Sequence, residues 1–383
     1  MLNDTLLSPA ALGPLALRNR LVMAPMTRNR ADADGVPGAL METYYRQRAT
    51  AGLIIAEAAT PNAVGQTYPN VPAIHGAAHV TGWRGVTGAV RDEGGRTFLQ
   101  IQHGGRVGHP DNSGLHPVAP SAVPLPDTIH TPAGPVPAVV PREMTEDEIH
   151  RTARDFAAAA RNAIDAGFDG VEVHSANGYL LHQFLGSNTN LRTDGYGGSV
   201  ENRVRFTLEV TRAVVDAVGA DRVGVRISPG VTANDLREDD TDVLYPVLVR
   251  GLAEIGPAYL HIVYADPDAP LFQEIRALWP TVLIANPILD DFTTGDVAAK
   301  SERLVDAGAD LVALGRPFLA NPDLVERLRL GAPLNQIQDR YLMYTGEATG
   351  YTDYPVLGDS PVVTPVVTPA VTPAVAPAVP LAG

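Results

Sequence analysis

The stretch from Val171 to Tyr179 joins the two β-branched residues of Val-Glu-Val to the polar sequence His-Ser-Ala-Asn-Gly-Tyr. The β-branched run ends abruptly in polar residues around a glycine, which predicts a buried strand followed by a loop. His174, Asn177 and Tyr179 cluster at that strand end, and each side chain can bind a polar group or donate a proton. In an α/β barrel the carboxyl ends of the strands carry the catalytic residues. The segment therefore indicates a site for chemistry as well as a fold.

Other polar residues lie in or directly after apolar runs. Gln100 ends one run, and Arg226 lies inside another, where a buried arginine is costly without a partner. Gly315 and Arg316 follow the last run, and a glycine beside a forked cation is typical of a phosphate site, with a surface turn as the alternative. Thr27 follows the first run, where a helix N-cap is an equally good interpretation.

The apolar runs and amphipathic stretches alternate along the chain. The predicted strands are Leu21–Met23, Leu53–Ala56, Thr97–Ile101, Gly170–His174, Val223–Ile227, Tyr259–Val263, Val282–Ala285 and Leu311–Leu314. The predicted helices lie near 39–51, 79–93, 145–166, 200–218, 240–254, 270–278, 295–307 and 321–330. Eight strands each followed by a helix are typical of a (β/α)8 TIM barrel. A doubly wound sheet is the alternative, but Ala24-Pro-Met-Thr27 after the first strand lacks its glycine-rich fingerprint.

Composition narrows the class of protein. The chain has 383 residues, of which 45% are hydrophobic, enough for one large barrel or two ordinary domains. It contains no cysteine, which excludes disulfides, a thiolate nucleophile and a cysteine-ligated iron–sulfur cluster. The net charge of −14 argues against a nucleic-acid surface. We find neither a signal peptide nor an apolar run that would span a membrane, so we expect a cytoplasmic protein.

Two segments depart from the alternating pattern. Residues 108–143 are rich in proline and show no helical period, so we expect a functional excursion or lid over the barrel mouth after the third strand. From Asp359 the chain repeats Val-Thr-Pro and Ala-Val-Pro units, and proline at this density is incompatible with helix or central strand. We therefore expect one domain over 1–358 and a disordered low-complexity tail over 359–383.

Several separated motifs together resemble the Old Yellow Enzyme family of FMN-dependent ene-reductases. The match runs from about Leu12 to about Leu357 and is most similar to the bacterial N-ethylmaleimide reductase and pentaerythritol tetranitrate reductase branch. The motifs are NRLVMAPMT (19–27), QIQHGGR (100–106), HSANGY (174–179), LRTDGYGGSVENR (191–203), LGRPF (314–318) and GYTDYP (350–355). Each motif alone is weak, but their common order makes the resemblance specific.

The resemblance implies one non-covalently bound FMN. Gln100 would both donate to and accept from the pyrimidine edge of the ring, and Arg226 would offset the charge that appears on reduction. The residues at positions that match flavin contacts or the walls of the flavin site are Pro25, Met26, Thr27, Ala58, Gln100, His174, Arg226, Asn286, Gly315 and Arg316. Asn286-Pro287 replaces a glycine-rich turn that is common in close relatives.

The resemblance also implies a two-step reaction. Hydride would pass from NADPH or NADH to flavin N5, and then from N5 to the β-carbon of an activated alkene. His174 and Asn177 would bind the electron-withdrawing oxygen of the substrate, and Tyr179 would protonate the α-carbon. The expected substrate-binding residues are His174, Asn177, Tyr68, Gln102 and Tyr351. Many relatives have tryptophan where this chain has Gln102, so the pocket should differ in shape.

There are two alternatives to this interpretation, and the composition excludes the first. The related dienoyl-CoA reductases add an iron–sulfur domain, which a chain without cysteine cannot hold. A barrel that binds a flavin or another ligand without catalysis is the alternative from a different class. We expect an activated alkene and NADPH or NADH as small-molecule partners, no metal, no nucleic acid and no membrane, and a monomer or homodimer.

Overall fold

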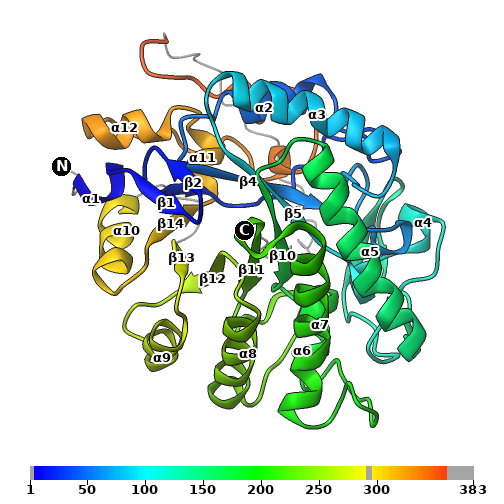
Figure 1. The fold of residues 1–383 in the computed structure, drawn as a ribbon. Coiled ribbons are helices and arrows are strands. Elements are labelled where there is room, and N and C mark those ends of the chain that lie inside the picture. The colour runs from blue at the N-terminus through cyan, green and yellow to red at the C-terminus, as the bar shows by residue number, and fades with distance from the viewer. Residues whose placement is uncertain (1–3, 290–295, 360–383) are drawn as a thin grey trace, which may run out of the picture.

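The computed structural model describes residues 4–289 and 296–359. At its centre, eight parallel strands close into a barrel in chain order, and the last strand pairs with the first (Figure 1). The strands are β3 (Leu21–Met23), β4 (Leu53–Ala59), β5 (Thr97–Ile101), β10 (Gly170–Ser175), β11 (Val223–Ile227), β12 (Tyr259–Ala265), β13 (Val282–Pro287) and β14 (Leu311–Leu314). The predicted TIM barrel is confirmed, and each strand begins at the predicted residue.

Helices cover the outside of the barrel (Figure 1). They are α2 (Ala39–Arg46), α3 (Ala77–Asp92), α5 (Glu146–Asp165), α7 (Val200–Val218), α8 (Thr241–Ile255), α9 (Pro270–Leu278), α10 (Val297–Asp306), α11 (Arg316–Ala320) and α12 (Leu324–Leu330). α5 and α7 start at side-chain caps, because Thr145 accepts from the Glu148 N–H and Ser199 from the Asn202 N–H. The helix predicted over 39–51 ends earlier, at Arg46, where the chain enters a series of turns.

Short helical elements connect these larger ones. They are α1 (Asp4–Leu7), α6 (Leu180–Leu185), η1 (Ala63–Gly65), η2 (Gly105–Val107), η3 (Ala220–Arg222), η4 (Ala233–Asp235) and η5 (Tyr341–Met343). Most of them are a single turn in the connections that follow or precede barrel strands. They carry no usable periodicity, and the sequence did not predict them.

An antiparallel hairpin of β1 (Ala10–Leu12) and β2 (Leu15–Leu17) precedes the barrel. Its strands have three residues each, too few for an alternating pattern, and the sequence did not predict them. Leu12 and Leu17 pack with inward-facing Val22 and Leu53 and other barrel residues in one buried apolar cluster. One end of the barrel interior is therefore filled with hydrocarbon, and polar side chains that face inward gather toward the carboxyl ends of the strands.

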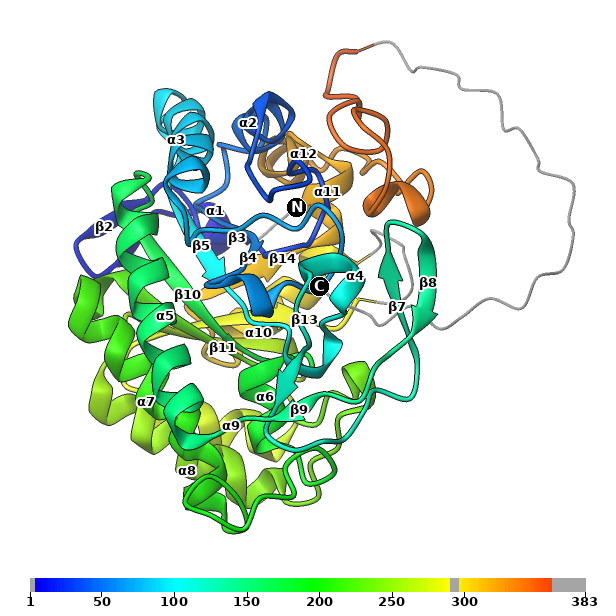
Figure 2. The same cartoon turned by 90° about the vertical axis from the view of Figure 1, so that its right-hand side faces the viewer.

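The segment 108–143 is an excursion after β5, as predicted, but it has secondary structure of its own. Its elements are α4 (Pro110–Ser113), β6 (Val118–Ala119), β7 (Thr128–Thr131), β8 (Gly134–Pro137) and β9 (Arg142–Glu143). β7 and β8 form an antiparallel hairpin that stands out from the barrel (Figure 2). Leu125 and Ile129 of the excursion pack in one cluster with Val107 and Tyr179. The excursion therefore covers the strand end that carries the polar motif.

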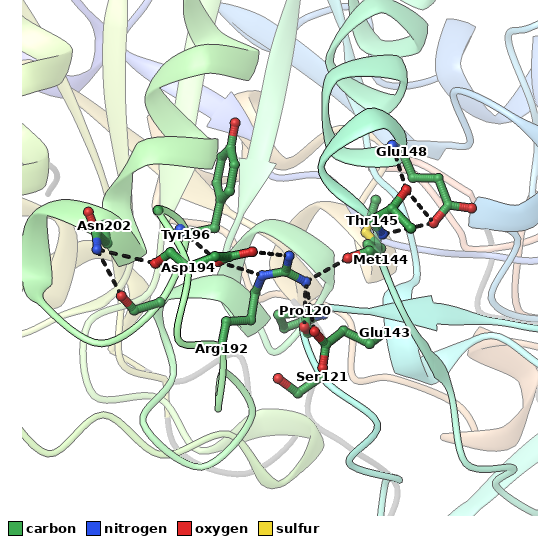
Figure 3. A network of polar contacts seen from close by, with 12 residues as sticks. Pro120, Ser121, Glu143, Met144, Thr145, Glu148, Arg192, Asp194, Tyr196 and Asn202 are labelled. Carbon is green, nitrogen blue, oxygen red and sulfur yellow. Dashed lines mark hydrogen bonds and ion pairs between the residues drawn. The ribbon is translucent and has the colours of Figure 1, made fainter.

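A buried arginine in the loop after α6 binds the main chain of the excursion and of the residue that directly follows it (Figure 3). Arg192 donates from Nη1 to the carbonyl of Pro120 at 3.0 Å and to that of Met144 at 2.6 Å. The same guanidinium forms an ion pair with Asp194. A carbonyl inside the excursion and one directly after it thus share one cation, which fixes the excursion relative to the barrel.

The C-terminal segment returns to the barrel and is held by arginines from the loop after β3. Arg28 donates to the carbonyls of Met343 and Gly350, both at 2.8 Å, and Arg30 donates to the carbonyl of Leu342 at 2.7 Å. The predicted tail lies outside the described residues from position 360 onward. Within the part of the chain that the structure describes, no helix combines the length and apolar character needed to cross a membrane.

Candidate active site at the carboxyl ends of the strands

A layer of buried polar side chains crosses the barrel beyond the apolar cluster. Strand register places Gln100 beside Glu172, His174 beside Arg226, and Arg226 beside His261. Each of these five residues is at most 3% exposed. The structure thus brings together three predicted site residues, Gln100, His174 and Arg226, with two that the sequence analysis did not single out.

Glu172 lies at the centre of this layer. Its Oε1 accepts from Gln100 Nε2 at 2.8 Å, and its Oε2 accepts from the Tyr259 hydroxyl at 3.1 Å and lies 2.8 Å from His261 Nδ1. Burial alone raises the pKa of the Glu172 carboxyl, but His261 and Arg226 and the bond from Gln100 outweigh burial and hold that pKa below its ordinary value. Glu172 is therefore an ionised carboxylate at neutral pH.

Arg226 provides the positive charge of the layer. Its Nη2 donates to Asn286 Oδ1 at 3.2 Å, and Asn286 in turn donates to the carbonyl of Ala313 at 2.8 Å. Burial lowers the pKa of Arg226, and the Glu172 carboxylate opposes that effect. Among the described residues, Arg226 Nε has no hydrogen-bond partner. A buried N–H without a partner is costly, and the acceptor atoms on the pyrimidine edge of FMN are groups that would satisfy it.

The loop after β10 has a strained, closely supported backbone. Asn177 and Gly178 both have positive φ, 55° and 75°. A Cβ at Gly178 would lie 2.3 Å from the carbonyl oxygen of Ala233, so only glycine fits there. The Asn177 N–H donates to Ser228 Oγ at 2.8 Å, and Asn234 Nδ2 donates to the Asn177 carbonyl at 2.8 Å. These bonds fix the main chain and leave the Asn177 side-chain oxygen without a partner in the described part of the chain.

A buried histidine supports the same loop from α6. The Gly178 N–H donates to His182 Nδ1 at 2.9 Å, so the ring proton must lie on Nε2, which is 3.0 Å from Glu238 Oε1. The Tyr245 hydroxyl donates to the same carboxylate oxygen at 2.7 Å. The left-handed turn at Asn177 and Gly178 is therefore held by His182 of α6 and by Ser228 and Asn234, which follow β11.

Tyr179 is 2% exposed, and its ring lies 5.5 Å from that of His174. Burial raises the pKa of Tyr179, and hydrogen bonding with Tyr68 and Asn234 offsets part of that rise. Burial and the neighbouring Tyr179 raise the pKa of Tyr68 well above its ordinary value. Both phenols therefore stay protonated at neutral pH, and Tyr68 packs beside Tyr179.

The predicted phosphate side lies where β14 pairs with β3. A Cβ at Gly315 would lie 3.3 Å from Met26 Sδ, so this glycine allows a close approach between the two strand ends. α11 begins at Arg316, which is half-buried. The other predicted flavin contacts on these neighbouring strands are buried Pro25, Met26 and Ala58 and half-buried Thr27.

The structure groups Tyr351 with arginines and another tyrosine. Its fully buried ring stacks on Tyr44 at 4.1 Å, and the guanidinium carbons of Arg28 and Arg30 lie 4.8 Å from its centroid. Tyr351 was expected, like Tyr68, to wall the substrate pocket, and its contacts in the structure are with Tyr44, Arg28 and Arg30.

The aromatic ring that affects the site electrostatically is Tyr344. Its hydroxyl contributes to the raised pKa values of both Tyr68 and Tyr179. Tyr344 is itself half-buried.

Gln102, another predicted substrate-binding residue, is 3% exposed directly after β5, where its main-chain N–H donates to the carbonyl of Ala59 at 3.0 Å.

Three residues of this region were missed from the sequence: Glu172, His261 and Tyr344. Glu172 carried a usable signal, because it lies two residues before His174 and strand alternation puts both on one face. His261 lies in an apolar run, where a single polar residue is easily read as structural. Tyr344 lies in an irregular segment, so its neighbours depend on tertiary folding alone.

No group of three or more His, Cys, Asp or Glu side chains within 4–289 and 296–359 could hold a metal ion. The chemistry available here is hydrogen bonding, charge stabilisation and proton transfer around a barrel mouth. A bound group would have to supply any redox chemistry.

Comparison with known proteins identifies the family of this arrangement. The model of the NADH:flavin oxidoreductase / NADH oxidase family matches residues 5–335. A probable flavin mononucleotide-dependent alkene reductase of Leishmania infantum is 43% identical over 366 residues, which covers 92% of this chain and 98% of that protein. The structure of the old yellow enzyme homologue from Zymomonas mobilis has a TM-score of 0.87 at 38% identity, over 92% of this chain and all of the other.

Morphinone reductase in complex with tetrahydroNAD has a TM-score of 0.86 at 44% identity, over 93% of this chain and 98% of the other. Similarity of this extent covers the barrel, the excursion and the C-terminal segment together. The polar layer and the HSANGY loop therefore lie in a scaffold that is shared along its whole length. The chain belongs to the NADH:flavin oxidoreductase / NADH oxidase family, the family of the Old Yellow Enzymes.

Proposed function

We propose that this protein reduces activated C=C bonds of α,β-unsaturated carbonyl compounds, maleimides and nitroalkenes, with non-covalent FMN and with NADPH or NADH as reductant. The observation that carries the proposal is the grouping of His174, Asn177 and Tyr179 at the end of β10, next to the layer that contains Gln100 and Arg226. The names of two relatives support it: one is a probable FMN-dependent alkene reductase, and another was solved with tetrahydroNAD.

The residues present fit an FMN. Arg226 Nε is a buried donor without a partner in the described chain, and Gln100 belongs to the same polar layer, on the other side of β10. Gly315 permits a close backbone approach, and Arg316 adds a cation at the same strand end, where a phosphate is expected in this fold. Bound FMN would supply the hydride acceptor and donor that the side chains lack.

His174 and Asn177 would hold the substrate through its electron-withdrawing oxygen. Burial and the charge of Arg226 lower the pKa of His174 well below its ordinary value, so its imidazole is neutral at physiological pH. A neutral N–H donor stabilises the negative charge that grows on the oxygen without giving up its proton. The fixed main chain of Asn177 keeps the second donor in place.

Tyr179 would protonate the α-carbon. Its raised pKa keeps the phenol protonated across the physiological range. The cover that Leu125 and Ile129 provide limits access of water to this proton. Tyr179 is thus a general acid that is shielded from water.

The test is a pair of half-reactions with the purified protein. The yellow protein should be bleached anaerobically by NADPH or NADH, and 2-cyclohexenone or N-ethylmaleimide should then restore the colour. Tyr179→Phe should keep the bleaching and lose most of the reoxidation by 2-cyclohexenone. A colourless protein without nicotinamide oxidation would refute the proposal. A yellow protein that is never reoxidised by an alkene would instead identify an inactive flavin-binding barrel.

A further inference from the structure

Gln100 contacts two neighbours through a single atom. Its Nε2 lies 2.8 Å from Glu172 Oε1 and 3.1 Å from His174 Nδ1. An amide nitrogen only donates, and an ionised carboxylate only accepts, so Gln100 must present Nε2 and not Oε1 to Glu172. Each of the two amide protons is then directed at one neighbour.

This arrangement determines where His174 carries its proton. Because Gln100 donates to Nδ1, that nitrogen must be unprotonated. A neutral imidazole carries one proton, so the proton lies on Nε2. The lowered pKa of His174 keeps the doubly protonated form scarce at neutral pH.

Glu172 is itself held as an acceptor. Its second oxygen accepts from the Tyr259 hydroxyl and lies 2.8 Å from His261 Nδ1. In a Glu172→Gln variant the new carbonyl oxygen would stay on those two donors and the new amide would face Gln100. Gln100 would then turn its own oxygen toward that amide, and the same oxygen would accept from His174 Nδ1–H.

We infer that Glu172 is a positioning residue that sets, through the amide of Gln100, which ring nitrogen of His174 carries the proton. The inference deepens the proposed function and rests on it, because the Nε2–H matters to turnover only if His174 binds the substrate oxygen.

Imidazole nitrogen shifts test the inference without turnover. The FMN-loaded protein is labelled with ¹⁵N-histidine, and two-bond ¹H–¹⁵N correlations distinguish protonated from unprotonated ring nitrogens. The chain has ten histidines, so the His174 signals are assigned by their loss in His174→Gln. Wild type should show His174 protonated at Nε2, and Glu172→Gln should show it protonated at Nδ1.

Glu57→Gln is the matched control. Glu57 is another fully buried carboxylate on a barrel strand, but its oxygens bind the Tyr45 hydroxyl and the Arg28 N–H. This variant should leave the proton of His174 on Nε2.

Glu172→Gln should also lower kcat/KM for 2-cyclohexenone about 100-fold, the usual cost of losing one such donor. Gln100→Met, which removes both bonds, should leave His174 in a mixture of the two neutral forms even if Glu172→Gln does not fold.

The outcomes separate the inference from the proposed function. Protonation at Nδ1 in wild type, or at Nε2 in a folded Glu172→Gln, overturns the role of Glu172. An equal change in Glu57→Gln also overturns it, because the effect would then follow from any buried substitution. If wild type reduces no alkene, the proposed function fails, and the histidine spectra still decide whether Glu172 sets the proton.

Discussion

Two buried clusters of this barrel contain the same kinds of residue and differ in what those residues bind. The first surrounds Glu172 and includes Arg226, His261 and Tyr259. The second surrounds Glu57, where Tyr45 binds the carboxylate and Arg28, Arg48 and their neighbours bind main-chain carbonyls. Both glutamates are 0% exposed.

The pKa values of the two carboxyls shift in opposite directions. Burial raises the pKa of Glu57 to about 6, whereas His261 and Arg226 hold that of Glu172 below its ordinary value. The arginines of the Glu57 cluster hold carbonyls of the C-terminal segment. Arg28 Nη1 and Arg226 Nε both lack a hydrogen-bond partner among the residues that the structure describes, but the Arg28 guanidinium lies over the rings of Tyr44 and Tyr351. Similar residues thus stabilise the fold in one cluster and belong to the proposed flavin site in the other.

The largest effect on catalysis should follow from a change beside the Glu172 cluster. Tyr179→Phe removes the proposed proton donor and should slow reoxidation by 2-cyclohexenone about 10²- to 10⁴-fold, the usual range for a general acid. Stopped-flow absorbance of the reduced enzyme measures this half-reaction, and reduction by NADPH serves as the internal control. An unchanged rate with 2-cyclohexenone would assign the proton to another donor.

The largest effect on stability should follow from a change in the Glu57 cluster. Arg48 is fully buried and donates to the carbonyls of Tyr44, Phe318 and Leu319, each at 2.8 Å. Arg48→Met leaves these carbonyls unsatisfied and should lower the free energy of unfolding by about 3 kcal/mol, as judged by chemical denaturation. Arg46→Met, an exposed site two residues away, is the control and should change little. Similar losses in both variants would show that the buried bonds contribute nothing.

The two carboxylates should give opposite pH dependences of stability. For Glu57 the folded pKa is raised from 4.5 to about 6, so the folded state binds the proton more tightly and stability falls as pH rises through that window. The shift corresponds to about 2 kcal/mol. For Glu172 the folded pKa is lowered, so stability is lost as pH falls through it, below the ordinary range of a glutamate.

Denaturation of wild type and Glu57→Gln at several pH values measures how much of the fall in stability with rising pH is due to Glu57. The decline between pH 4.5 and 6 should be weaker in the variant, because the titrating group is gone. An equally steep decline in Glu57→Gln would assign the slope to other groups.

The smallest expected effects distinguish the two candidate pocket tyrosines. Tyr344→Phe alters the ring that is electrostatically coupled to Tyr68 and Tyr179, and it should change KM for alkenes severalfold. The Tyr351 hydroxyl has no hydrogen-bond partner in the described residues, so Tyr351→Phe should leave KM and stability nearly unchanged. Steady-state kinetics with 2-cyclohexenone compares the KM values of the two variants. The reverse order would restore Tyr351 as the pocket wall expected from the sequence.

The barrel strands could be predicted because each is a short, continuous apolar run between turns. Four strands extend beyond their predicted ends, and in two of them, β4 and β12, the register shifts near the carboxyl end. Such irregularities break the apolar pattern from which a strand end is read. The hairpins β1–β2 and β7–β8 could not be predicted, because their strands of three or four residues are partly exposed and too short for a measurable alternation. The equally short strands β3 and β14 are fully buried apolar runs.

The site could be predicted only in part. Polar residues that interrupt a strand or follow it directly, such as His174 and Arg226, stand out against apolar neighbours. The arrangement around them depends on pairs that are distant in the chain: Gln100 and Glu172 are 72 residues apart and meet only because β5 and β10 pair in register. Tyr351 could be proposed from its sequence motif and Tyr344 could not, and only tertiary packing shows that Tyr351 lies against Arg28 and Arg30.

The sequence by itself determined the alternation of strands and helices, the absence of thiol chemistry and the polar residues at the strand ends. It could do so because apolar periodicity and residue chemistry are local properties. Only the tertiary structure decided which donors are used and which are left for a bound molecule. Gln100 has two amide protons in any conformation, but closure of the barrel brings Glu172 and His174 within reach of both.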